Sequence, residues 1–599
     1  MTSTKEYFEY DTYVDPTVAP NGTLAVLQHD RGSSQCIVVN LDYERTSEQI
    51  VSVEDRMRSY DWVNEDTIWY TVWGDPSIRY LDMVAVLDGE SVGESIRERQ
   101  IEDDHDVVFD ILPGPEHDQF AVSVREGLTY STRIYSAGDL TEPVEQFPMY
   151  NNHRLLTWRP DGECVLVKEI NDSFSHRLVA LDLANGKKQV VTDEIKDARY
   201  VTPGWDPEGR NLYLVTDYEA DRLYAARLSP DDRTLTPVVE RTDHTVESIG
   251  VHDSGRLMYS VNHDGISTVY VGELKGDKEV EAQPLTDLPS GVATHAAFGP
   301  EGNRLVLTVS TETVPSAVYV CDIDTRTVSR WLSSPSPSNT FMDTPDERLS
   351  RVIRYTSDDS REIPALFTRP PVGTDLRGAV VDVHGGPENQ RRPRYRPHLH
   401  WFIERGYAVL EPNIRGSTGY GRQYANLDEG PRRIDAADDV ATGGEWLRSQ
   451  VETDHVVVSG TSHGGLLALV NAYRSPEVFD AAISTAGIYD LEKFVQSLEI
   501  ENRELRVAKY GNPSKNQELF DTLSPLRHAD EVDIPVLVVH GEDDRTVLAD
   551  GARQFVESVA ASGEHAEVLL FEDEGHSIES LESIRTKYER LASFLGTVL

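Results

Sequence analysis

The sequence predicts two domains of different type: a seven-bladed β-propeller and, after it, a parallel sheet covered by helices on both faces. In the first half of the chain, short strand-like runs alternate with turns at a nearly constant spacing. In the second half, continuous apolar strands alternate with longer helical segments. The length of 599 residues is several times that of a usual domain, so at least two separate cores are expected.

Turn segments mark the repeat of the first half. They share one turn position, which falls at Pro20, Asn64, Pro115, Pro160, Pro207, Asp253 and Pro300, so successive copies are 44 to 51 residues apart. One antiparallel sheet of this size cannot bury both faces, and radial stacking of such sheets solves that problem. We therefore expect an N-terminal extension over 1–19 and a seven-bladed propeller over 20–332. Trp158, Trp205 and Phe298, which precede three of the turns, are expected to pack between blades.

A Ser/Pro-rich segment separates the two halves, and we assign residues 333–345 to a linker. Beyond it the Val- and Ile-rich strands read "GAVVDVHGG", "YAVLEPN", "HVVVSG", "DAAISTAG", "IPVLVVHG" and "AEVLLFEDEGH". Such runs, separated by helices, are typical of a parallel sheet that is buried on both faces. Active sites in such sheets lie at the carboxyl ends of the strands, so we expect the catalytic residues there.

Ser462 lies between the strand "HVVVS" and a helix that begins near Gly464, in the motif G-x-S-x-G. This is the context of a nucleophile elbow, which exposes a serine oxygen at the end of a strand. Gly460 and Gly464 suit it, since strand and helix approach closely there and a Cβ would crowd them. The sequence thus predicts an α/β-hydrolase domain over 346–599 with Ser462 as the nucleophile.

The serine needs a general base, and the base needs an acid that fixes its tautomer. In this fold the chain order is Ser, then acid, then His, which leaves His565 and His576 after "IPVLVVHG". His565 precedes the last strand, whereas His576 follows its carboxyl end, so we predict His576 as the base. Glu542, Asp543 and Asp544 are all candidates for the acid, and spacing alone does not separate them.

An oxyanion hole is also expected, with backbone N–H donors aimed at the attacked carbonyl. One donor is the amide of His463, and Gly386 in "VHGGPE" supplies the other. His384 is interpreted as a structural hydrogen-bonding residue. The loop "NIRGSTGYGRQY" lacks the pattern of a nucleotide-binding loop and is expected to shape the wall of the site. There Arg415 either meets substrate or forms a structural salt bridge.

Together these motifs resemble the prolyl oligopeptidase family, most closely its acylaminoacyl-peptidase and dipeptidyl-aminopeptidase-like branch. They are "HGGP" at 384–387, "RGSTGYG" at 415–421, "GTSHGG" at 460–465, "HGEDDRTV" at 540–547 and "DEGH" at 573–576. The resemblance implies Asp544 as the acid, because the family pattern H-G-x-x-D places it four residues after the histidine. It also implies oxyanion roles for the amides of Gly386 and His463, although the family most often has Tyr where His463 stands. No clear glutamate pair for gripping a free amino terminus is visible.

Acidic residues outnumber basic ones 103 to 57, which gives a formal charge of −46. Nucleic acid and anionic membranes are therefore poor partners. Salt screens such a surface, so we expect adaptation to high salt. The absence of a long apolar run and of a signal-peptide plan at the start leads us to expect a cytoplasmic protein. Cys36, Cys164 and Cys321 lack metal-ligand spacing and are interpreted as small buried apolar residues.

The expected function is a serine peptidase that hydrolyses short peptides through an acyl-enzyme, without metal or organic cofactor, as an acylaminoacyl-peptidase or oligopeptidase. A dipeptidyl aminopeptidase and an esterase of the same fold are the alternatives, and a scaffold protein with a dead hydrolase domain is a third. Short peptides are the expected partners, and a homo-oligomer is possible.

Overall fold

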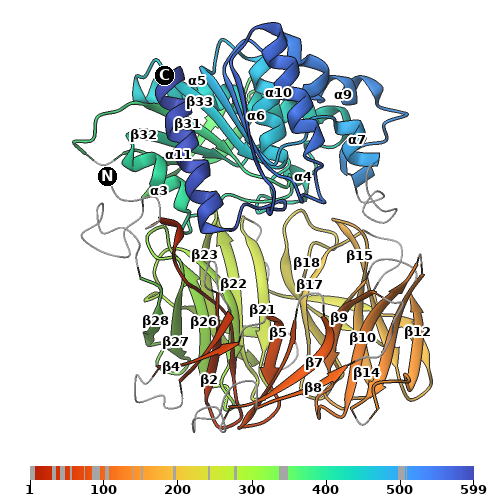
Figure 1. Cartoon of the computed structure of the whole chain (residues 1–599). Coiled ribbons are helices and arrows are strands. Elements are labelled where there is room, and N and C mark those ends of the chain that lie inside the picture. Colours follow the sequence, from red (N-terminus) through yellow and green to blue (C-terminus); the bar gives the residue numbers. More distant parts are fainter. Residues whose placement is uncertain are drawn as a thin grey trace.

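The computed structural model describes the chain from residue 7 to residue 599, apart from 30–34, 41–47, 54–56, 73–74, 84–94, 101–106, 128, 138, 150–152, 193–196, 240–242, 276–278, 336–348, 371, 497–505 and 508. The N-terminal half forms a β-propeller and the C-terminal half an α/β domain that lies on one face of it (Figure 1). The predicted combination of a propeller and a hydrolase domain is confirmed.

The described residues of the first half form seven four-stranded antiparallel sheets, each made of consecutive strands. The strands of the first four sheets are β1 Thr12–Val18, β2 Leu24–His29, β3 Gln35–Asn40, β4 Glu48–Val53; β5 Met57–Trp62, β6 Thr67–Val72, β7 Asp75–Asp82, β8 Ile96–Gln100; β9 Val107–Pro113, β10 Gln119–Glu126, β11 Thr129–Ser136, β12 Glu145–Met149; β13 His153–Trp158, β14 Cys164–Asp172, β15 Ser175–Asp182 and β16 Lys187–Val190. Those of the last three are β17 Tyr200–Trp205, β18 Leu212–Thr216, β19 Tyr224–Ser229, β20 Thr234–Val239; β21 Thr245–Val251, β22 Arg256–His263, β23 Ile266–Lys275, β24 Glu279–Pro284; β25 Val292–Phe298, β26 Arg304–Ser310, β27 Ala317–Asp322 and β28 Val328–Ser333.

Hydrophobic clusters join each of these sheets to the next, and one cluster joins the last sheet to the first. Tyr13 and Leu24 of the first sheet pack there with Val306 and Val318 of the last. Each predicted turn lies between the first and second strands of a different sheet. Trp158, Trp205 and Phe298 contact clusters that span neighbouring sheets, as predicted.

The first sheet begins earlier than the sequence suggested. Strand β1 lies within the predicted extension 1–19, yet it pairs with β2 along its length. Tyr7 and Phe8 pack against Trp401 and Tyr588 of the hydrolase domain. The start of the described chain thus belongs to both domains. Most of the predicted linker, 336–345, lies outside the described residues.

The second half contains an eight-stranded sheet in the order β29-β30-β32-β31-β33-β34-β35-β36. Its strands are β29 Ser350–Thr356, β30 Glu362–Thr368, β31 Gly378–Val383, β32 Tyr407–Pro412, β33 Val456–Thr461, β34 Ala481–Thr485, β35 Val536–Gly541 and β36 Ala566–Phe571. The last six in the chain pair in parallel and coincide with the six predicted strands. The antiparallel strands β29 and β30, which the sequence reading did not include, extend one edge.

Helices cover both faces of this sheet and create two cores. The described α-helices are α3 Pro397–Glu404, α4 Arg422–Ala425, α5 Ile434–Val451, α6 His463–Arg474, α7 Leu491–Gln496, α9 Gln517–Thr522, α10 Asp550–Ser562 and α11 Leu581–Val598, with 3-10 turns at Gly430–Arg433 and Pro525–Glu531. Helices α5, α6 and α10 pack on one face, and α3 and α11 on the other. No helix in the described part of the chain is long and apolar enough to span a bilayer.

Two of the three cysteines are buried in the propeller, as expected. Burial raises the pKa of Cys164 to about 11 and that of Cys321 to about 12, so both remain neutral thiols. The side chain of Cys36 lies outside the described residues.

Candidate active site

Ser462 lies at the sharp turn between β33 and α6. Its φ of +57° is in the left-handed region that non-glycine residues rarely adopt. Its N–H donates to the carbonyl of Thr485 at 2.9 Å, which ties the turn to the neighbouring strand. A Cβ on Gly464 would lie 2.1 Å from the carbonyl oxygen of Val383, and one on Gly460 would lie 2.2 Å from that of Gly464. Both positions therefore require glycine.

His576 lies between Ser462 and Asp544. Its Nε2 is 3.1 Å from Ser462 Oγ, and its Nδ1 is 2.7 Å from Asp544 Oδ2. These are the distances that proton transfer from a serine to an oriented imidazole requires. Of the histidine candidates, His565 instead contacts Glu567 at the other end of β36, at 2.9 Å. The three residues come from the loops after β33, β35 and β36, so the strand-end rule located all of them.

The three adjacent acids in the loop after β35 differ in their contacts. Asp544 is buried, and its Oδ1 accepts the backbone N–H groups of Thr546 at 2.7 Å and Val547 at 2.9 Å. Asp543 is exposed, and Glu542 pairs with Arg553 at the surface. Only Asp544 faces the imidazole.

A second imidazole, which the sequence analysis missed, also contacts this carboxylate. His540 Nε2 lies 3.1 Å from Asp544 Oδ2 and 2.9 Å from the carbonyl oxygen of Val547. Burial alone would raise the pKa of Asp544, but the hydrogen bonds from His540, His576 and Val547 N–H outweigh it and hold that pKa well below its usual value. The carboxylate therefore stays ionised. The signal was present, because His540 opens the "HGEDD" segment itself.

The predicted oxyanion donors border Ser462. His463 is the first residue of α6, so its N–H has no acceptor within the helix. The loop of Gly385 and Gly386 runs alongside, since a Cβ on Gly385 would lie 3.3 Å from Ser462 Cβ. Gly386 has a φ of +126°, which favours glycine. Tyr510 Oη lies 3.4 Å from both the Gly386 carbonyl oxygen and His463 Nδ1.

This arrangement agrees with the family comparison. Residues 393–599, which hold all three members of the hydrogen-bonded chain, match the prolyl oligopeptidase family. The C-terminal domain is therefore similar to the prolyl oligopeptidase family over these residues. The resemblance drawn from the motifs is thus confirmed.

Relatives that are similar in sequence carry several peptidase names. The chain is 29% identical over 457 residues to "Dipeptidyl aminopeptidase BIII" of Pseudoxanthomonas mexicana, an alignment that covers 73% of this chain and 58% of the relative. It is 25% identical to "Acylamino-acid-releasing enzyme 1" of Oryza sativa subsp. japonica, over 56% of this chain and 48% of the relative. The chain thus spans about half the length of these relatives.

Solved structures share the fold over the whole chain. A puromycin-hydrolyzing peptidase of Mycobacterium tuberculosis superposes with a TM-score of 0.84 at 18% identity, covering 100% of this chain and 96% of the other. Acylaminoacyl peptidase of Pyrococcus horikoshii superposes with a TM-score of 0.77 at 16% identity, covering 100% and 98%. These two superpositions cover the propeller and the α/β domain together, so the two-domain fold is shared.

His384 and Arg415, which the motifs also contain, have structural contacts. His384 Nδ1–H donates to the Gly385 carbonyl at 2.8 Å, its Nε2 lies 3.0 Å from Ser417 Oγ, and burial lowers its pKa to about 4. Arg415 is buried against Asp439, with contacts of 2.6 and 2.8 Å. The salt-bridge reading of Arg415 is therefore the correct one. The loop that contains Arg415 contacts the propeller, because the Gly419 carbonyl oxygen accepts a hydrogen bond from Thr245 Oγ1 at 3.2 Å.

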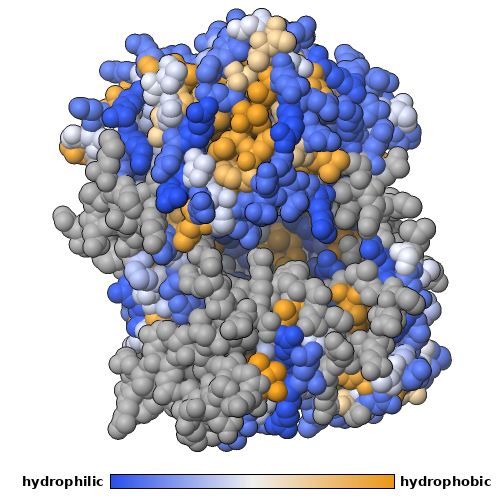
Figure 2. Space-filling view, in the orientation of Figure 1, coloured by the Kyte–Doolittle hydropathy of each residue, from blue (hydrophilic) through white to orange (hydrophobic). Residues whose placement is uncertain are grey.

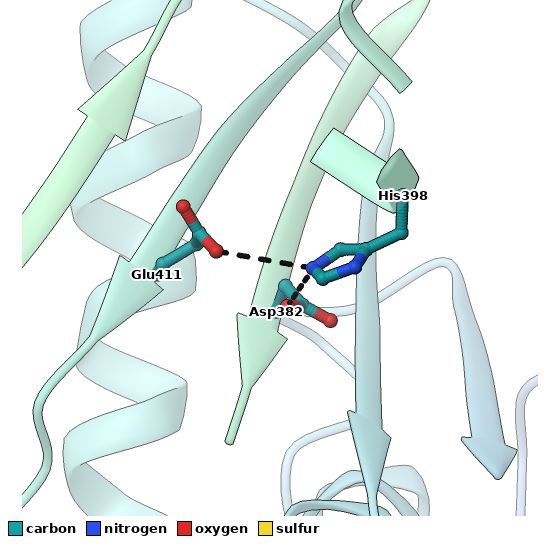
Figure 3. Close-up of side chains that lie close together, drawn as sticks. All are labelled: Asp382, His398 and Glu411. Atoms are coloured by element: carbon teal, nitrogen blue, oxygen red, sulfur yellow. Dashed lines mark ion pairs between the residues drawn. The ribbon is translucent and has the colours of Figure 1, made fainter. Parts of the chain in front are cut away.

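One cluster has the spacing of a metal site. Ligand atoms of Asp382, His398 and Glu411 lie within 4.8 Å of one another, with His398 Nε2 at 3.2 Å from Asp382 Oδ2 and 3.9 Å from Glu411 Oε1 (Figure 3). However, Arg391 pairs with Asp382 and Arg396 pairs with Glu411. Since guanidinium groups already neutralise both carboxylates, the residues fit an ion-pair network better than a metal.

Proposed function

We propose that this protein is a serine peptidase in which Ser462, His576 and Asp544 form the catalytic triad. The observation that carries the proposal is the continuous hydrogen-bonded chain from Ser462 Oγ through His576 to Asp544. Ser462 attacks the scissile carbonyl while His576 accepts its proton. Asp544 holds the imidazole in the required tautomer and stabilises the imidazolium.

The second half of the reaction uses the same groups in reverse. His576 donates the proton to the leaving amine, and water then attacks the acyl-enzyme with His576 again as the base. The backbone N–H groups of Gly386 and His463 stabilise the negative charge on the carbonyl oxygen in both steps. What supports this assignment is the contact between their two segments and Ser462. None of these steps requires a metal or an organic cofactor.

Short peptides are the proposed substrates. We infer that the seven described sheets are seven blades of one closed ring, which covers the active site and excludes folded proteins. In support, a cavity of about 600 Å³ borders His576 and is lined by both domains. Salt bridges hold the domains together, among them Arg392 to Glu247 at 2.9 and 3.0 Å and Arg354 to Asp264 at 2.7 Å.

Within this class we propose acylaminoacyl-peptidase or oligopeptidase activity. Dipeptidyl aminopeptidase is the second candidate, favoured by the name of the Pseudoxanthomonas mexicana relative. An esterase of the same fold is the third. Matched substrates distinguish the three activities. N-acetylated and free-amino peptides show whether a blocked or a free amino terminus is required, and an ester and an amide of one acyl group show which leaving group is accepted.

Labelling with a fluorophosphonate probe tests whether Ser462 is an activated nucleophile. The wild type is expected to label, and Ser462→Ala is expected not to label, because the probe reacts only with an activated serine. A scaffold protein with an inert hydrolase domain would not label in either form.

Assembly into a homo-oligomer is proposed through the free edge of the sheet. In its support, β36 is the last strand in the order, and Val568 on it is 38% exposed. Unpaired edge strands are templates for pairing with a second chain. Light scattering of the wild type and of Val568→Lys distinguishes a dimer that uses this edge from a monomer.

A further inference from the structure

The cavity of about 600 Å³ beside His576 has walls from both domains. The propeller contributes residues of β1 and β25, and the hydrolase domain contributes the segment 391–398, the segment 576–578 and the first half of α11. In Figure 1, α11 runs from the side of the α/β domain that faces the propeller up to the C-terminus, so its beginning lies nearest the propeller. The cavity is therefore enclosed by elements far apart in the sequence.

The wall of this cavity is positively charged, although the chain as a whole is strongly acidic. Its described lining residues include the cations Arg391, Arg394, Arg396 and Lys587 and no aspartate or glutamate. In the whole chain acidic residues outnumber basic ones 103 to 57. An acid-free wall in such a chain indicates a site for an anion.

Two of these cations have no carboxylate partner among the described residues. Arg391 pairs with Asp382 and Arg396 pairs with Glu411, the two carboxylates drawn in Figure 3. Arg394 forms no ion pair with the described residues, and its side chain is open to the cavity. Lys587 likewise forms no ion pair with the described residues; its Nζ lies 5.6 Å from the centroid of the Tyr588 ring, and Asp382 acts on it only through its charge.

The same two groups sit in an unfavourable electrostatic environment. Burial lowers the pKa of Lys587 to about 8. Burial and the neighbouring charges of Arg396 and Arg391 lower the pKa of Arg394. A bound carboxylate would relieve the repulsion among these cations.

The position of the cavity identifies which part of a substrate enters it. His576 and the two residues after it form part of the wall, whereas His463 and Tyr510 do not. In the proposed mechanism His576 protonates the leaving amine, so the leaving fragment departs on this side. That fragment carries a carboxylate at its C-terminus or on an acidic side chain.

We propose that Arg394 and Lys587 bind a carboxylate of the leaving fragment and so direct the enzyme toward short peptides whose negative charge lies just beyond the cleaved bond. The proposal rests on the peptidase function given above. It adds a specificity site on the leaving-group side. A charge-assisted bond to each cation accounts for a preference of about 10- to 100-fold over an uncharged fragment.

The test compares three forms of one peptide that the wild type cleaves: the free acid, the C-terminal amide, and the amide with glutamate as its last residue. The readout is kcat/KM for each form, measured by chromatography of the products. We expect the wild type to prefer the free acid to the plain amide by about 10-fold or more. Arg394→Ala and Lys587→Met should each reduce that ratio, and Arg394→Lys should retain part of it.

Arg585→Ala is the matched control, because Arg585 is on α11 but its side chain is 60% exposed and outside the cavity wall. It should keep the wild-type ratio. If the glutamate amide matches the free acid, any carboxylate is accepted; if only the free acid is preferred, the terminal carboxylate is the ligand. Both results support the site. It is overturned if the wild type cleaves all three forms equally, or if both cavity variants keep the preference. If the wild type cleaves no peptide at all, the peptidase function itself is refuted.

Discussion

His576 Nε2 lies 3.1 Å from Ser462 Oγ, although the two residues are 114 positions apart in the chain. Parallel pairing brings them together, because the carboxyl ends of β33 and β36 point in the same direction. Asp544, at the end of β35 between them, completes the chain of hydrogen bonds. The reactivity of the serine therefore depends on groups that only the folded sheet assembles.

Replacement of Asp544 tests the orientation of the imidazole. Asp544→Asn keeps the shape but offers an N–H to His576 or leaves it in the wrong tautomer, so kcat should fall by about 10³- to 10⁴-fold. Asp543→Asn is the control, since that neighbouring side chain is exposed. Peptide or ester hydrolysis measures both. Equal losses in the two variants would contradict the assignment of the acid.

The nucleophile turn has no room for a side chain at Gly464. Gly464→Ala places a Cβ 2.1 Å from the Val383 carbonyl oxygen, so β31 or α6 must shift. We expect a destabilisation of at least about 2 kcal/mol, with loss of probe labelling at Ser462. Gly596→Ala, in α11 with nothing within 4 Å of the added Cβ, should not lower the melting temperature. Denaturant unfolding and labelling measure the two effects, and a fully stable, labelled Gly464→Ala would refute the close approach.

Lys587 should cost stability in the empty enzyme. Its pKa of about 8 lies below the usual value of ~10.4, which the unfolded chain retains. Below pH 8 both states are protonated and the full cost of burying the cation applies. Between pH 8 and ~10.4 only the unfolded state stays protonated, so the cost decreases as the pH rises.

Lys587→Met should therefore raise the melting temperature at pH 7 and raise it less at pH 9.5. Lys493→Met, which changes a lysine that is 70% exposed, should show neither effect. Differential scanning calorimetry at the two pH values measures the difference. A lower melting temperature for Lys587→Met at pH 7 would contradict a net cost of burying this cation.

High salt should stabilise the protein. Hydrophilic residues cover most of the described part of the face in Figure 2, and the formal charge is −46. In 1 M salt the Debye length falls to about 3 Å, so repulsion among the carboxylates is screened. The melting temperature should rise between low and molar KCl. A temperature that stays constant or falls would refute adaptation to salt.

Sequence reasoning located the three residues of the proposed triad because their signals are local: each residue lies in the loop that follows an apolar strand. It could not choose Asp544 over Asp543 by spacing, since that choice depends on two backbone N–H groups that turn one carboxylate inward. The first sheet was placed too late because the segment before Pro20 carries no turn signal of its own, and its pairing with β2 decides its structure.

The cationic cavity could not be predicted from the sequence at all. Arg394 and Lys587 lie on different elements, and the propeller strands that close the cavity come from the opposite half of the chain. No periodicity links them. The charge contrast appears only when the lining residues are identified in the folded structure.

The most direct test of the central claim is the hydrolysis, in molar KCl, of matched N-acetylated and free-amino peptide anilides by the wild type and by Ser462→Ala. We predict cleavage by the wild type and a loss of at least ~10³-fold in the variant, with the ratio of blocked to free substrate choosing between acylaminoacyl-peptidase and dipeptidyl aminopeptidase activity. If the wild type hydrolyses esters but no amide, the enzyme is an esterase and the peptidase proposal is wrong.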